Sequence, residues 1–365
     1  MEIENILENP EIVRKIAGEI TELASKLKAP MKIMEVCGTH TQAVAEFGIR
    51  RLLPSNVILI SGPGCPVCVT PSSYIEQAIA LARKGHTITT FGDLIKVPSQ
   101  GNSLEREMAA GAKVTVVYSP MDALKLAKEN PQSGVVFMAV GFETTTPSIC
   151  ATLLEAKNKN VHNFKILCAH KVIPPPLKVL ASDPELKIDG FICPGNVSVI
   201  IGARTYDFLP REYKRGAVVT GFEPAEILAA IKELVSQKVF SSPENLNLYK
   251  RVVKEGGNPV ALELINRFFE AEDTEWRGFG VIPKSGLKLK EEWKEFDAGL
   301  IPVEFEKPEE PAGCKCGEVL KGIVSPKECP LMGKMCTPMN PVGACMVSNE
   351  GSCAAYYRYE RRQYE

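Results

Sequence analysis

The arrangement of apolar and polar residues along the chain predicts a protein in which strands alternate with helices. Residues 5–28 carry isoleucine and leucine at helical spacing and are expected to form a helix. From residue 31 to about residue 235, short β-branched runs alternate with segments of helical periodicity. Continuous apolar strands separated by helices are typical of parallel sheets that are covered on both faces.

Eight segments fit the strand pattern and five fit the helix pattern. The expected strands are Lys32–Val36, Val57–Ile60, Thr87–Phe91, Lys113–Tyr118, Val135–Val140, Lys165–Cys168, Gly190–Cys193 and Ala217–Thr220. The expected helices are Thr41–Leu53, Ser72–Lys84, Met121–Glu129, Pro147–Lys157 and Pro224–Ser236. This number of strands in about two hundred residues favours two doubly wound, Rossmann-like units over a single barrel.

Changes in this pattern divide the chain into five parts. Residues 242–272 again have helical periodicity, and Gly278–Pro311 are rich in proline and charge, which is typical of irregular strands or a linker. We expect a helical lead, a first α/β domain that carries a thiol site, a second α/β domain, a helical return with a linker, and a small cysteine-rich domain. Their expected bounds are 1–30, 31–118, 119–235, 236–312 and 313–365.

Charge and composition exclude several classes of function. The 43 lysines and arginines nearly balance the 44 aspartates and glutamates, so a nucleic-acid partner is not expected. No apolar run approaches the ~20 residues of a membrane helix, and the first residues lack the features of a signal peptide. We therefore expect a cytoplasmic protein with no membrane partner. A phosphate-binding loop, a dinucleotide fingerprint and a nucleophile elbow are all missing, so no nucleotide is expected either.

Cysteine is the unusual component of the sequence. The chain has 12 cysteines, and six of them fall within the 52 positions from 314 to 365. A reducing cytoplasm does not favour a disulfide framework, and a chain of 365 residues folds without one. The concentration of cysteine therefore indicates a metal site or redox chemistry.

One group of candidate ligands lies near the start of the α/β region. Cys37 and His40 form a C-x-x-H pair, and Cys65 and Cys68 form a C-x-x-C pair, with 24 residues between the pairs. Both pairs follow expected strands, so neighbouring strands would bring them together. Three interpretations stay open, namely a structural zinc site, a redox dithiol at Cys65 and Cys68, and a soft iron site held by the thiolates.

The second group is the cluster of cysteines near the end of the chain. Its members are Cys314, Cys316, Cys329, Cys336, Cys345 and Cys353. Their irregular spacing, and the lack of histidine around them, fit a [4Fe–4S] cluster held by four thiolates better than a zinc ribbon. A zinc-bound or disulfide-stapled segment is the alternative.

Polar and glycine-rich stretches follow five of the expected strands. They are Cys37–Thr41, Gly62–Cys68, Gly141–Pro147, Ala169–Lys171 and Pro194–Ser198. The carboxyl ends of parallel strands are where open α/β sheets build their sites. We therefore expect these stretches to meet in a cleft, at one sheet edge or at the facing edges of two domains.

Several of these stretches together resemble a known family. The sequences C-G-T-H-T from Cys37, G-P-G-C-P-V-C from Gly62, G-F-E-T-T from Gly141 and P-V-G-A-C-M-V-S from Pro341 are similar to motifs of the HypD family of [NiFe]-hydrogenase maturation factors. The resemblance extends from about residue 31 to about residue 358.

The resemblance implies more than the spacing of residues does. It implies two similar α/β domains and a small third domain with a [4Fe–4S] cluster. It also implies a scaffold that works with a HypC partner, and on which an iron atom acquires two cyanides and one carbon monoxide. A HypE partner supplies the cyanides as a thiocyanate, and the Fe(CN)2CO group then passes to the hydrogenase. Whether such a scaffold is itself an enzyme stays open.

The motifs carry expected roles onto particular residues. Cys37, Cys65 and Cys68 resemble the iron-handling and redox-active thiols of the family, and His40 would orient a ligand or donate a proton. The expected cluster ligands are Cys314, Cys329, Cys336 and Cys353, with Cys316 and then Cys345 as substitutes. One position departs from the family, because Asn196 stands where a histidine is usual, and an amide cannot carry a proton near neutral pH.

Two alternatives to the scaffold remain. A cluster-linked dithiol/disulfide reductase would use the cluster to reduce a Cys65–Cys68 disulfide. A non-catalytic zinc protein would use the C-x-x-H and C-x-x-C pairs only to staple an interaction surface.

Overall fold

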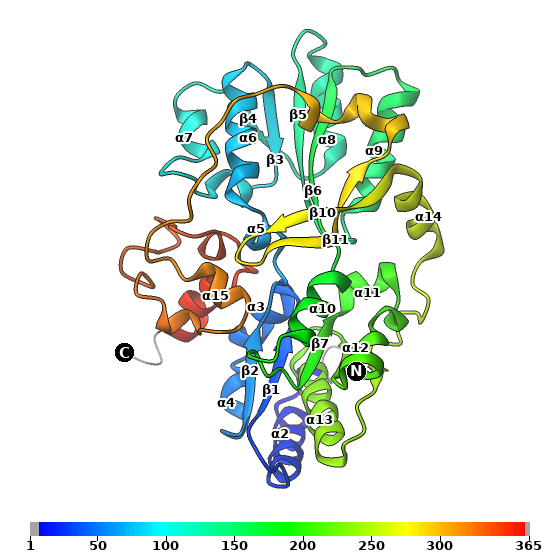
Figure 1. Cartoon of the computed structure of the whole chain (residues 1–365), viewed down its shortest axis with the longest axis vertical. Helices are drawn as coiled ribbons and strands as arrows, with labels where there is room; N and C mark the ends of the chain where they lie inside the picture. Colours follow the sequence, from blue (N-terminus) through cyan, green and yellow to red (C-terminus); the bar gives the residue numbers. More distant parts are fainter. Residues whose placement is uncertain (1–6, 362–365) are drawn as a thin grey trace.

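Two parallel sheets organise the chain, and they lie one above the other along the long axis of the molecule (Figure 1). The computed structural model describes residues 7–361. Sheet A has the order β2-β1-β7-β8-β9, and sheet B has the order β4-β3-β5-β6. All neighbouring strands within both sheets are parallel. The expected α/β class with two parallel-sheet units is therefore confirmed.

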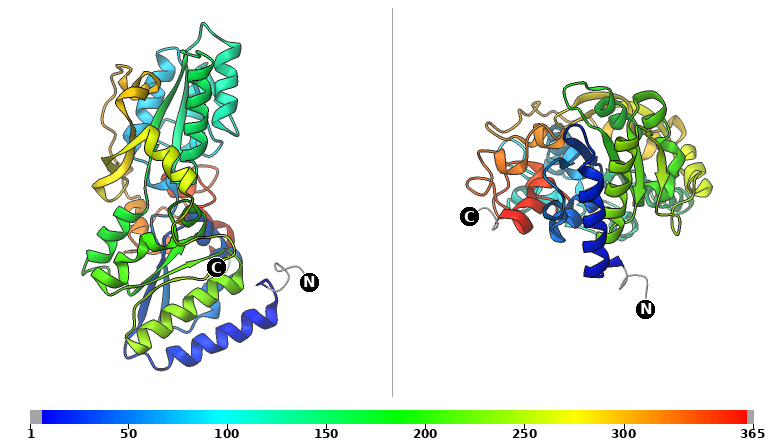
Figure 2. Two further views of the ribbon diagram at one scale, coloured as in Figure 1. Left: turned by 90° about the vertical axis from the view of Figure 1, so that its right-hand side faces the viewer. Right: turned by 90° about the horizontal axis from the view of Figure 1, so that it is seen from below.

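Sheet A and its helices form the unit drawn at the bottom of Figure 1. Its strands are β1 (Met31–Glu35), β2 (Val57–Ser61), β7 (Gly190–Pro194), β8 (Gly216–Thr220) and β9 (Asn245–Asn247). Its helices are α2 (Pro10–Ala24), α3 (Gly38–Glu46), α4 (Ile49–Leu52), α5 (Pro66–Val69), α10 (Pro174–Ser182), α11 (Gly195–Ile201), α12 (Phe208–Tyr213) and α13 (Pro224–Phe240). Figure 2 shows α2 and α13 side by side, and both pack their apolar residues against one face of this sheet.

Sheet B and its helices form the upper unit. Its strands are β3 (Thr87–Thr90), β4 (Val114–Val116), β5 (Val135–Gly141) and β6 (Phe164–His170). Its helices are α6 (Ser72–Arg83), α7 (Leu104–Ala109), α8 (Pro120–Glu129) and α9 (Thr146–Asn158). Every residue of β5 is buried, as expected for a strand covered on both faces.

A helix and a hairpin connect the two units. They are α14 (Pro259–Phe268), followed by the antiparallel strands β10 (Phe269–Trp276) and β11 (Gly280–Leu289). The chain then returns along the side of the molecule to residues 313–361, which we call the tail (Figure 1). The tail contains only α15 (Cys316–Leu320), α16 (Ser352–Ala355) and single turns. The short turns of the chain are η1 (Leu94–Lys96), η2 (Ala203–Tyr206), η3 (Glu291–Phe296), η4 (Ala298–Leu300), η5 (Pro326–Glu328), η6 (Ala344–Met346) and η7 (Tyr356–Glu360).

The sheets differ from the domain division that the sequence suggested. A boundary at residue 118 places β1 to β4 in one domain, whereas β1 pairs with β7, and β3 pairs with β5. Sheet B is therefore inserted into the unit of sheet A. Strand periodicity indicates where strands are but not which of them pair, so the pattern could not show this insertion.

Three expected elements need correction. The expected helix at 242–272 is helical only in α14, and it also contains β9 and the start of β10. The first part of the segment expected as irregular strands or a linker is the regular strand β11, and the four acidic residues of β10 obscure the alternation of this hairpin. The expected helix Thr41–Leu53 is divided at Gly48, whose φ of 64° ends α3. The expected helical lead is α2, and residues 5 and 6 lie outside the described part of the chain.

Within residues 7–361, none of the helices has the length and apolar character that crossing a membrane requires.

Candidate functional site

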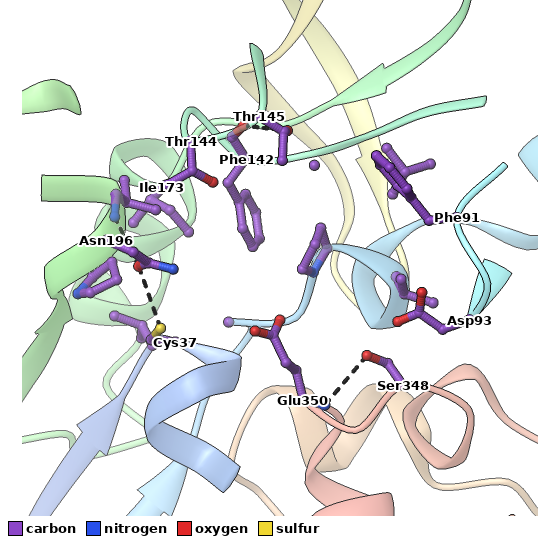
Figure 3. Close-up of a pocket in the computed structure, with 18 of the residues that line it drawn as sticks. Cys37, Phe91, Asp93, Phe142, Thr144, Thr145, Ile173, Asn196, Ser348 and Glu350 are labelled. Carbon is purple, nitrogen blue, oxygen red and sulfur yellow. Dashed lines mark hydrogen bonds between the residues drawn. The ribbon is translucent and has the colours of Figure 1, made fainter. Parts of the chain in front are cut away.

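A cavity of about 230 Å³ lies where strand ends of sheet A and sheet B face each other (Figure 3). We call it the strand-end cavity. It is lined by Val36, Cys37, Gly64, Pro66, Val67, Phe91, Asp93, Leu94, Val140, Gly141, Phe142, Thr144, Thr145, Ile173, Pro194, Asn196, Val197, Ser348 and Glu350. Four of the five polar stretches that follow expected strands contribute to this lining. The fifth, Ala169–Lys171, does not.

Cys37 lies at the end of β1, where a close backbone contact holds it. A Cβ atom on Gly64 would lie 2.3 Å from the backbone nitrogen of Cys37, so only glycine fits there. The amide of Gly38 donates a hydrogen bond to the Gly64 carbonyl over 3.0 Å. The two loops that follow β1 and β2 are therefore fixed to each other, as the sequence predicted for the two cysteine pairs.

A buried carboxylate is hydrogen-bonded to this loop. Glu35 accepts hydrogen bonds from the backbone nitrogen of Cys37 over 3.3 Å and from the hydroxyl of Thr41 over 2.6 Å. Burial raises the pKa of Glu35 to about 7, against the opposing effect of its hydrogen bonds. The carboxyl group therefore changes its charge near neutral pH, in direct contact with the Cys37 loop.

The Cys37 thiol is free and points toward Asn196 (Figure 3). Its Sγ donates to Asn196 Oδ1 over 3.6 Å, and the residue is 3% exposed. Burial raises the pKa of the thiol to about 12. A metal ion that binds at Cys37 must therefore displace the proton, which links binding to pH.

Cys65 and Cys68 form a disulfide in the turn that contains α5. Both residues are buried, and the Cys68 backbone nitrogen donates to Cys65 Sγ over 3.2 Å. Their neighbours Gly64, Pro66 and Val67 line the strand-end cavity beside Cys37. Of the three sequence-predicted thiols at the sheet edge, only Cys37 is free in this state, because a disulfide sulfur is not a thiolate ligand.

His40 faces away from the cavity lining. Its Nε2 lies 2.8 Å from the carbonyl oxygen of Gly221, its Nδ1 has no partner among the described residues, and its ring lies 4.7 Å from the ring of Phe222. Burial lowers the pKa of His40 to about 4, so the ring is neutral. In this geometry His40 ties α3 to the loop after β8.

The cavity is also lined by two carboxylates that the sequence pattern did not place there. Glu350 comes from the tail and accepts a hydrogen bond from the hydroxyl of Thr39 over 2.9 Å. Burial raises its pKa, and the charge of Asp93 acts in the same direction. Asp93 follows β3, so the strand-end rule identifies it. Glu350 follows no strand, and only its closeness to the Pro341–Ser348 motif indicates it.

Two of the six cysteines of the tail lie at the centre of a hydrogen-bonded group, and Cys314 and Cys353 are hydrogen-bonded to them. Cys316 Sγ and Cys345 Sγ lie 2.8 Å apart, and both residues are fully enclosed. Hydrogen bonds with Cys314 and Cys345, followed by the charge of Arg277, hold the pKa of Cys316 below its ordinary value. The hydrogen bond with Cys316 raises the pKa of Cys345. The remaining thiols are Cys314, Cys329, Cys336 and Cys353.

The chemistry of these four residues fits an iron–sulfur cluster. Cys314 Sγ occupies space that a side chain at position 343 would fill, since a Cβ on Gly343 would lie 2.7 Å from it. Thiolates are the ligands that such clusters use. Among residues 7–361, no three histidine, cysteine, aspartate or glutamate side chains are already arranged around a common metal position.

Comparisons with known proteins agree over nearly the whole chain. A family model described as "HypD: Hydrogenase formation hypA family" matches residues 11–360. Hydrogenase maturation factor HypD of Escherichia coli (strain K12) is 44% identical over 364 residues, which cover 98% of this chain and 97% of that protein. The HypD proteins of Azotobacter vinelandii and Rhodobacter capsulatus are 43% and 41% identical, and each alignment covers 96% of this chain and at least 94% of the relative.

Proposed function

Because this chain belongs to the HypD family of hydrogenase maturation factors, we propose that it is the scaffold on which the Fe(CN)2CO group of a [NiFe]-hydrogenase is assembled. HypC- and HypE-like proteins are its partners, and the cytoplasm is its location. The observation that carries the proposal is the place of Cys37, whose free thiol lies at a small cavity that is also lined by the loop of the Cys65–Cys68 pair.

Iron is the cargo in this proposal, and Cys37 supplies the thiolate that holds it. Thiolate sulfur is a soft ligand that suits ferrous iron and leaves coordination positions open. The cavity of about 230 Å³ is large enough for a metal with diatomic ligands and too small for a nucleotide. Cys65 and Cys68 can join Cys37 as ligands only when they are reduced.

The Cys65–Cys68 pair supplies electrons in the proposed reaction. Release of cyanide from a thiocyanate breaks the bond between its sulfur and carbon and requires two electrons. The dithiol provides them as it forms the Cys65–Cys68 bond and gives up two protons. One proton goes to the thiol left on the donor, and the other is released with the cyanide. The close approach of Cys65 and Cys68, which are joined as a disulfide in the structure, supports this role.

A [4Fe–4S] cluster in the tail is part of the same proposal. Cys314, Cys329, Cys336 and Cys353 are the proposed ligands, with Cys316 and then Cys345 as substitutes. When bound, such a cluster transfers single electrons. The tail packs against the sheet units through one continuous apolar core, which includes Cys65, Cys68, Cys316 and Cys345.

The test begins with anaerobic protein that is produced together with its HypC- and HypE-like partners. We expect infrared bands of iron-bound cyanide and carbon monoxide, and about four irons and four sulfides per chain beyond the cargo iron. The Cys37→Ser variant should lose the infrared bands and keep the sulfide. The control Cys150→Ala removes a buried thiol of α9, outside the cavity, and should keep both. Bands that persist in Cys37→Ser would refute the proposal.

The disulfide also favours a second candidate, the cluster-linked dithiol/disulfide reductase. In Cys68→Ala a pure reductase would lose turnover but still bind its partners, whereas the scaffold would bind iron but fail to acquire cyanide. Zinc in place of iron and sulfide in the same metal analysis would favour the non-catalytic zinc protein over both.

A further inference from the structure

The turn between β10 and β11 reaches the end of the disulfide segment through Arg277. The backbone nitrogen of Arg277 donates to the Val69 carbonyl over 2.9 Å, and its Nε donates to the Thr70 carbonyl over 3.1 Å. These carbonyls directly follow Cys68 and end α5. A positive charge at this position faces the carbonyl end of the turn that carries the disulfide.

The same turn touches the tail. Gly278 and Gly317 approach so closely that a Cβ on Gly278 would lie 2.4 Å from the Cα of Gly317. Gly317 directly follows Cys316, one of the cysteines of the tail. Arg277 therefore lies between the disulfide segment and the cysteines of the tail.

Among residues 7–361, Glu310 is the ion-pair partner of Arg277, and the two side chains differ in their exposure to water. Its Nη1 contacts both carboxylate oxygens of Glu310, at 2.8 and 2.7 Å, and donates to Ser72 Oγ over 2.9 Å. The side chain of Arg277 is 2% exposed, whereas that of Glu310 is 53% exposed. Water screens the carboxylate much more than the guanidinium, so Glu310 cancels only part of the field that buried groups experience. The buried Nη2 of Arg277 has no acceptor among the described residues.

We propose that the Arg277–Glu310 ion pair sets the reduction potential of the Cys65–Cys68 pair, with Arg277 raising it and Glu310 lowering it. This inference rests on the proposed dithiol chemistry. Any thiolate that the reduced pair forms carries negative charge, whereas the disulfide is neutral. A buried cation nearby stabilises the reduced form, and a carboxylate that neutralises this cation has the opposite effect. Arg277 is a positioning residue in this scheme, because it acts through Cys65 and Cys68.

Two variants of the ion pair are expected to shift the reduction potential of the Cys65–Cys68 pair in opposite directions. Arg277→Gln removes the cation and leaves the carboxylate, so the disulfide should be favoured about tenfold, a potential lower by about 30 mV. Glu310→Gln keeps a hydrogen-bond acceptor for Arg277 but removes the counter-charge, so the potential should rise. Arg277→Lys keeps the charge and should stay near the wild-type potential, although it loses part of the hydrogen bonding.

The experiment equilibrates the full chain anaerobically in glutathione buffers of known ratio. Two glutathione thiols reduce the disulfide and become one glutathione disulfide, so the electrons balance. The sample is acid-quenched and alkylated, and the peptide that contains Cys65 and Cys68 is quantified by mass spectrometry. Shifts of opposite sign in Arg277→Gln and Glu310→Gln support the proposal.

Two results would overturn it, and they have different meanings. Equal or same-direction shifts in the two variants would show that breaking the ion pair acts only by loosening the structure, and the proposed scaffold function would be unaffected. A wild-type pair that does not titrate reversibly would remove the dithiol from the proposed function and this inference with it.

Discussion

Cys37 and the Cys65–Cys68 pair lie at the ends of hydrogen-bonded strands, whereas the cysteines of the tail lie in turns and very short helices. At the sheet edge, β1 and β2 pair along their whole length, and the loop contact between Gly38 and Gly64 continues this pairing. In the tail, isolated bridges such as Met332 with Cys336 replace regular sheet. Backbone structure positions the first set of thiols, whereas in the proposed function the second set depends on the cluster that it holds.

The largest expected effect follows from this dependence. Cys336→Ser removes one proposed cluster ligand, and we expect the amides of residues 313–361 to lose about 10,000-fold of their protection from hydrogen exchange, which corresponds to about 5.5 kcal/mol. The amides of β5 and β6 should be unchanged. Hydrogen exchange with mass spectrometry measures both on anaerobic protein. The same substitution at the sheet edge, Cys37→Ser, is the control and should leave both regions protected. Equal protection of the tail in Cys336→Ser and wild type would contradict the proposal that a cluster holds the tail in place.

The sheet edge should instead be sensitive to backbone packing. Gly64→Ala places a Cβ against the backbone of Cys37, and we expect it to lower the free energy of unfolding by about 4 kcal/mol. Gly18 in α2 provides a matched control, because a Cβ there meets nothing within 4 Å. Gly18→Ala should raise stability by up to about 1 kcal/mol, since alanine favours the helix. Urea unfolding of the three proteins measures both changes, and a small loss in Gly64→Ala would show that the loop contact is not rigid.

The smallest of the three effects concerns protons at the sheet edge. Burial raises the pKa of Glu35 from 4.5 to about 7, so between these values the folded state keeps a proton that the unfolded state releases. Stability should therefore fall as pH rises from 4.5 to 7 and then level off, by about 3 kcal/mol in all. Glu143, whose pKa burial also raises to about 7, contributes in the same range.

Two substitutions separate these contributions. Glu35→Gln should reduce the slope of unfolding free energy against pH between 4.5 and 7, and adding Glu143→Gln should reduce it further. Urea unfolding at a series of pH values gives these slopes. A slope that is unchanged in Glu35→Gln would mean that this carboxyl group is already ionised in the folded protein at low pH.

Local patterns in the sequence predicted much of the fold. All eight expected strands are present, because most of them are short apolar or β-branched runs of the kind that parallel sheets bury. The run Val135–Val140 is an example, since β5 is buried at every residue. The hairpin of β10 and β11 was missed because Glu270 and Asp273 are exposed on it, and charge in a strand looks like loop or helix.

The candidate site was predictable where it follows strands and unpredictable where it depends on pairing between distant segments. The rule that polar residues follow parallel strands identified Cys37, Gly141 and Asn196 as neighbours of one cavity. The same rule cannot find Glu350, which reaches the cavity from the tail, or Arg277, which reaches α5 from a hairpin turn. Their positions depend on packing between parts of the chain that no local pattern relates.

The insertion of sheet B into the unit of sheet A determines the order in which the chain can fold during synthesis. All four strands of sheet B lie between residues 87 and 170, so this sheet can close while later residues are still being made. Strands β1 and β2 emerge first but must wait for β7 at residue 190 before β1 gains its second neighbour. Asn196, the partner of the Cys37 thiol, also arrives only then. A nascent chain therefore carries its earliest cysteine uncovered through most of translation, and it gains a closed cavity only when the tail brings Glu350 into place.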